Sequence, residues 1–70
     1  MDKKVNSAII SSYEYDSAKY ELTVTFKSGE AWTYKNVMPP VVSTVFDSPG
    51  SVGSKFLRLI KKQYQSVKSN

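Results

Sequence analysis

The side chains that could carry catalysis here are carboxylates, hydroxyls and amines, because the sequence contains no histidine and no cysteine. That composition excludes thiol and imidazole mechanisms, disulfides and zinc clusters. No acid lies in an apolar run, which is the setting that raises a carboxyl pKa for acid–base work, and no spacing pairs a hydroxyl with a base. We therefore predict a protein that is not an enzyme and that uses no metal or cofactor. The acids are Asp2, Glu14, Asp16, Glu21, Glu30 and Asp47.

Positive charge is concentrated at the C-terminal end of the chain. Residues 1–50 carry five lysines and six acids, a net charge of −1, whereas residues 51–70 carry five cations and no acid, a net charge of +5. Such asymmetry favours an anionic partner such as RNA or another polyanion. A solvated helix face that keeps the protein soluble is the equally weighted alternative. The residues predicted to share one side of the last helix are Lys55, Arg58, Lys61 and Lys62.

A loop rich in glycine and serine precedes these cations, over residues 48–55. Its backbone amides and the start of the following helix could hold one phosphate with Ser51, Ser54 and Lys55. It is not a P-loop, because Gly50 and Gly53 are too close together for that motif. The favoured interpretation is a simpler one, in which a serine caps the helix.

Three segments have the pattern of strands. Residues 8–15 are rich in strand formers and end in a turn-like cluster, and residues 20–27 alternate with a period of two. Ser28-Gly29 predicts a tight hairpin before the third strand, residues 31–35. This order predicts an antiparallel meander with one apolar and one polar face. The alternation places on the apolar face Tyr20, Leu22, Val24 and Phe26.

Two helices are predicted after the strands. The first begins near Pro39-Pro40, since proline is tolerated in a first helical turn, and ends at the breaker of residues 47–50. The second begins near Ser51–Ser54 and buries Phe56, Leu57, Ile60 and Tyr64 on the side opposite the cations. The polar tail of residues 65–70 is expected to fray. The predicted fold class is α+β, a three-stranded antiparallel meander followed by two α-helices.

Trp32 and Tyr34 are candidates for stacking on unpaired bases. Their alternation with the other strands, however, places both side chains on the apolar face, so core packing is the favoured interpretation.

The order of these residues resembles the KTSC family. The similar positions cover roughly residues 7–64, and the central aromatic-x-aromatic signature is Trp32-Thr33-Tyr34, with Trp where relatives usually have Tyr. A second difference is Leu57, where relatives often carry Asn. The family is named after a C-terminal extension of some lysyl-tRNA synthetases and also occurs as free-standing bacterial and phage proteins. The resemblance implies RNA as a partner through that attachment, and it implies no catalytic activity.

We predict a single domain over residues 1–70, ordered over about 7–64, in the cytoplasm, with no membrane contact. The first functional hypothesis is a weak RNA-binding module that uses the basic helix. The alternative is a protein-interaction or self-associating module, such as a phage-encoded adaptor or inhibitor, acting with a protein partner or as a homodimer.

Overall fold

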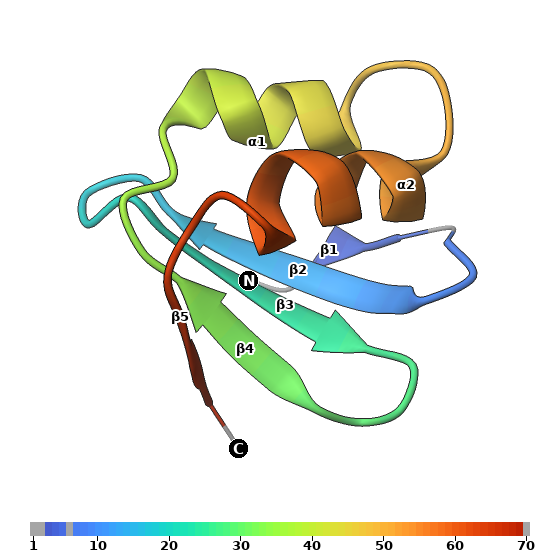
Figure 1. The fold of residues 1–70 in the computed structure, drawn as a ribbon, viewed down its shortest axis with the longest axis horizontal. Helices are drawn as coiled ribbons and strands as arrows, with labels where there is room; N and C mark the ends of the chain where they lie inside the picture. The colour runs from blue at the N-terminus through green and yellow to red at the C-terminus, as the bar shows by residue number, and fades with distance from the viewer. Residues whose placement is uncertain (1–2, 6, 70) are drawn as a thin grey trace.

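One antiparallel sheet organises the molecule, whose computed structural model describes residues 3–5 and 7–69. Its strands follow chain order, β1 to β5, so that each pairs with the next (Figure 1). The central three, β2 to β4, are the predicted meander, and the predicted α+β class is confirmed. The strands are β1 Lys3–Lys4, β2 Ile10–Asp16, β3 Glu21–Phe26, β4 Ala31–Tyr34 and β5 Ser66–Lys68.

The register of β3 against β4 places the predicted apolar side chains on one face. Leu22 pairs with Tyr34 and Val24 with Trp32, and Leu22 and Val24 are fully buried. Tyr20 was predicted to join this face, and that prediction is wrong: its side chain is 40% exposed. The reason is its backbone, which turns into the left-handed region (φ 56°) before β3 begins, where its carbonyl accepts the amide of Val37.

Two helical segments cover this face of the sheet (Figure 1). Helix α1, Pro39–Phe46, begins with both prolines in its first turn and ends at the C-cap Asp47, as predicted. Helix α2, Val52–Phe56, continues directly into one π-helical turn, η1, Leu57–Lys61. Among residues 3–5 and 7–69, no helix is long and apolar enough to cross a membrane.

The core is built around Phe56, which is fully buried. The rings of Phe26 and Tyr34 meet its ring edge to face, with centroids 5.6 and 5.4 Å away. On β2, the ring of Tyr13 stacks on that of Phe46 from α1, with their centroids 3.8 Å apart. These ring contacts fix α1 and α2 on the sheet and so position the side chains described below.

The tail of residues 65–70 was predicted to fray, and that prediction is wrong for residues 66–68. Residues 66–68 form β5 along the outer edge of β4, with Val67 opposite Thr33. The amide of Ser69 donates to Ala31, and the Thr33 hydroxyl lies 2.6 Å from that of Ser69. The Thr33 and Ser69 side chains lie on the sheet face away from the helices. Because these residues are polar, the pattern of hydrophobic residues could not predict this strand.

Candidate functional site

Three of the four predicted cations form an exposed group on the second helix. Arg58, Lys61 and Lys62 all lie at the surface, in and directly after η1. We call these three residues the basic face. Among the described residues, none of the three lies within 4.0 Å of a carboxylate oxygen. Their charges are therefore not compensated by an ion pair within this part of the chain.

Lys55 does not belong to the basic face, so its predicted location is wrong. Its residue is only 8% exposed, and its ammonium group turns back toward the end of α1. There it donates to the carbonyl oxygens of Ser48 and Pro49, at 2.7 and 3.0 Å, and contacts the Ser48 hydroxyl at 2.8 Å. These oxygens follow the C-cap of α1, a position that favours a cation. Helical periodicity could not reveal this, because the partners lie in the preceding loop.

The serine loop caps the helix, as the favoured interpretation predicted. The Ser51 hydroxyl accepts the amide of Ser54 at 3.3 Å, and the Ser51 carbonyl accepts the amide of Lys55 at 3.1 Å. Ser51 and Ser54 are exposed, but the Lys55 ammonium group points elsewhere. The three groups therefore do not converge on one phosphate.

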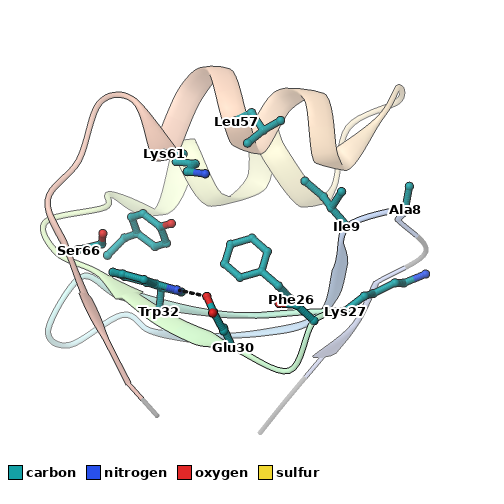
Figure 2. A pocket seen from close by; sticks show the side chains of 11 residues that line it. Ala8, Ile9, Phe26, Lys27, Glu30, Trp32, Leu57, Lys61 and Ser66 are labelled. Carbon is teal, nitrogen blue, oxygen red and sulfur yellow. Dashed lines mark hydrogen bonds between the residues drawn. The ribbon is translucent and has the colours of Figure 1, made fainter.

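A solvent-open groove of about 680 Å³ lies beside the basic face, between η1 and the β3–β4 hairpin. We call it the aromatic groove. Figure 2 shows Leu57 and Lys61 on the helix side, with Phe26 and Trp32 on the sheet side. It is lined by Ala8, Ile9, Phe26, Lys27, Ser28, Glu30, Trp32, Tyr34, Leu57, Lys61 and Ser66.

The groove exposes more apolar surface than the sequence predicted. Leu57 was expected in the core, but its side chain is 38% exposed at the groove's rim, and Ile9 is similarly exposed. Tyr34 is buried as expected, whereas Trp32 is only half-buried. No aromatic ring of the described residues packs against Trp32. The groove itself escaped sequence reasoning because its walls come from five separate segments.

One hydrogen bond and one ion pair hold the Trp32 ring and its neighbour Glu30 in place. The indole Nε1 donates to Glu30 Oε1 at 3.2 Å (Figure 2), and Glu30 Oε2 lies 3.9 Å from the Lys68 ammonium. The hairpin turns at Gly29, which has a positive φ of 100°. Lys27 and Glu30, on either side of this turn, both line the groove. Lys68 thus offsets the negative charge of Glu30, which is the only acid among the described residues that line the groove.

Burial raises the pKa of the Tyr34 hydroxyl above its ordinary value, while a hydrogen bond to Ser66 acts in the opposite direction. The phenol is therefore neutral at physiological pH.

Nothing in the described residues points to catalysis. Asp16 accepts backbone amides in its own turn, and Glu21 pairs with Lys35 at 3.1 Å on the surface. No three acids within residues 3–5 and 7–69 gather as metal ligands. Asp2 lies outside the described residues.

The chain matches the model of the KTSC domain over residues 6–64, which is most of its length. It belongs to the KTSC family. The structure is similar to the crystal structure of a KTSC domain protein from Yersinia pestis, with a TM-score of 0.88 at 27% sequence identity, covering 100% of this chain and 97% of the other. Among curated proteins, no relative matches.

Family positions of this KTSC domain gather at the aromatic groove. Trp32 and Tyr34 of the aromatic signature line it, as does Leu57. Gly53 lies behind its rim, where an added Cβ would stand 3.1 Å from Ile9 Cγ1. Trp32 and Leu57 thus belong to one surface.

Proposed function

We propose that this KTSC domain is a binding module with no catalytic activity of its own, and that it binds RNA weakly through phosphate contacts. The observation that carries the proposal is the basic face: three exposed cations without an ion-pair partner among the described residues, in a segment that contains no acid. Lysine and arginine at such positions attract phosphates and release their counterions. We expect this to occur in the cytoplasm.

Three contacts support only a weak and sequence-independent interaction. Non-specific binding of this kind has a Kd on the order of 10⁻⁴ to 10⁻⁶ M at physiological salt. Arg58 can grip a phosphate with two parallel hydrogen bonds, whereas Lys61 and Lys62 act as point charges. The proposed function is thus that of an accessory domain, which adds affinity without choosing a sequence.

Titration with single-stranded RNA, followed residue by residue by NMR, tests the proposal. At about 50 mM salt, where phosphate contacts are strongest, we expect the amide shifts to concentrate at the basic face and to shrink at about 200 mM salt. The double variant Arg58→Glu, Lys62→Glu should abolish binding. Its matched control, Lys4→Glu with Lys19→Glu, changes the net charge equally at exposed lysines in β1 and the β2–β3 turn. Equal loss of affinity in both variants would contradict the proposal.

Exposed apolar side chains favour a second candidate function, a protein-interaction or self-associating module. Ile9 and Leu57 are each more than one-third exposed at the rim of the aromatic groove. Light scattering across a range of protein concentrations tests self-association directly. A mass that stays at 7.9 kDa would exclude a homodimer in that range.

A further inference from the structure

We infer that the aromatic groove is a seat for one unpaired nucleobase of the bound RNA strand, with the phosphates on the two sides of that nucleotide held by Lys61 and Lys27. This inference rests on the proposed function and adds to it a contact with the base. With such a seat, the surface distinguishes single-stranded from fully paired RNA, whereas phosphate contacts alone do not.

The first supporting observation is the state of Trp32. Its ring is half-buried and no aromatic ring of the described residues covers it, while its edge is held by the hydrogen bond to Glu30. Phe26 beside it is held by its edge-to-face contact with Phe56. A base that stacks on such fixed rings immobilises no further aromatic side chain, which lowers the entropic cost of binding.

The second observation is the charge around the groove. Lys27 and Lys61 line it from opposite sides, the hairpin and η1, and among the described residues neither has a carboxylate within 4.0 Å. Glu30, the only acid among the described lining residues, already accepts a hydrogen bond from Trp32 and lies near Lys68. The opening is therefore cationic around an apolar floor. That combination fits a flat ring attached to a phosphate better than it fits an uncharged apolar segment.

The third observation is continuity with the basic face. Lys61 belongs both to that face and to the lining of the groove, so a strand lying along η1 passes the opening. The volume of about 680 Å³ is ample for a single nucleotide and lies within the usual range of small-ligand sites. One nucleotide can turn inward while its neighbours stay on the helix.

Trp32 is the only tryptophan in the chain, so its fluorescence reports directly on the groove. The full chain is titrated with an eight-nucleotide oligoadenylate and, separately, with an abasic ribose-phosphate strand of the same length. We expect the oligoadenylate to quench Trp32 and to bind about 5- to 150-fold more tightly, the fold-change that corresponds to stacking one base. The abasic strand should bind with little quenching.

Substitutions then separate the groove from the basic face. Lys61→Gln and Lys62→Gln remove the same charge, but only Lys61 lines the groove. We expect Lys61→Gln to reduce the preference for the base-containing strand and Lys62→Gln to weaken both strands alike. Trp32→Ala should remove the preference while abasic binding persists. The control for Trp32→Ala is Tyr20→Asn, which replaces an exposed aromatic residue outside the groove.

The outcomes distinguish the two proposals. Equal affinity for both strands without a change in Trp32 fluorescence would overturn the nucleobase seat and leave phosphate binding intact. Binding of neither strand would overturn both. Adenosine monophosphate that matches the affinity of the oligomer would assign the groove to a free nucleotide instead. If the Trp32 emission shifts with protein concentration in the absence of RNA, the groove would be assigned to a second copy of the chain.

Discussion

The Lys55 ammonium group donates a hydrogen bond to the Ser48 carbonyl oxygen across 2.7 Å, and this contact ties the last turn of α2 to the loop that follows α1. One side chain thus spans the loop between the helices. Lys55 and Lys61 are both lysines of one helical segment, so the sequence could not show that they have different roles. The first stabilises the fold, and the second remains available at the surface.

Replacing Lys55 by Met should destabilise the fold without weakening RNA binding. The substitution keeps an unbranched side chain as far as Cε but removes the charged donor from three oxygens, which costs about 1.5–3 kcal/mol in the free energy of unfolding. Urea denaturation measures the change. Lys62→Met is the matched control, and we expect the opposite pattern there, unchanged stability and weaker RNA affinity. Weaker affinity in folded Lys55→Met would contradict the assignment.

The salt dependence of RNA affinity should reflect three cations and not the five of residues 51–70. Each phosphate contact on a single strand contributes about −0.7 to the slope of log Kobs against log salt, so the basic face predicts about −2 for an abasic strand. A strand whose base enters the groove also meets Lys27, and four contacts predict about −3. Fluorescence anisotropy at several salt concentrations gives both slopes. Identical slopes for the two strands would argue against a role for Lys27.

Gly53→Ala should destabilise the protein even though alanine is the better helix former. The new Cβ would lie 3.1 Å from Ile9 Cγ1, 3.3 Å from Ile9 Cδ1 and 3.2 Å from Ser7 Oγ, so α2 or these side chains must move, at a cost of roughly 1–3 kcal/mol. The added methyl group should cost less when Ile9→Ala is also present, since that change removes the two Ile9 atoms and leaves only the Ser7 contact. Thermal unfolding of the two single variants and the double variant measures this coupling. Strict additivity would show that the contact relaxes freely.

Stability should fall as pH rises above about 10, in part because of Tyr34. Burial raises its pKa in the folded state, so the unfolded chain, with a tyrosine pKa of about 10, loses the proton first. The stabilisation is complete below that value and is lost as pH rises through the folded pKa. The change in urea midpoint between about pH 8 and pH 11 should be smaller in Tyr34→Phe. Tyr15, whose pKa burial also raises, leaves part of the effect in place.

The central fold could be predicted because it follows from local patterns. The alternation of Leu22 and Val24 with polar residues defines a half-buried strand, and two prolines followed by valines define α1. Tyr20 was misplaced because a left-handed backbone at a non-glycine residue leaves no clear trace in the sequence. The strand β5 was missed because its pairing depends on a distant partner, β4, and not on its own polar composition.

The candidate site was only partly predictable for the same reason. Arg58, Lys61 and Lys62 were found because consecutive turns of one helix bring them together. The aromatic groove needs Ile9, Phe26, Trp32 and Leu57 side by side, and no spacing along the chain encodes that. Leu57 was expected in the core because its type and helical position match those of a buried residue, but the sheet beneath it leaves an opening.

The short strand β5 also protects the protein against aggregation. It occupies the hydrogen-bonding edge of β4, where Trp32 and Tyr34 would otherwise present a strand of high β propensity to other molecules. In its place the outermost strand is three residues long and carries Lys68, and brief lysine-bearing edges resist growth into cross-β fibrils. A chain cut after Gln65 would lose this cover. Residues 66–68 thereby act as a gatekeeper for β4.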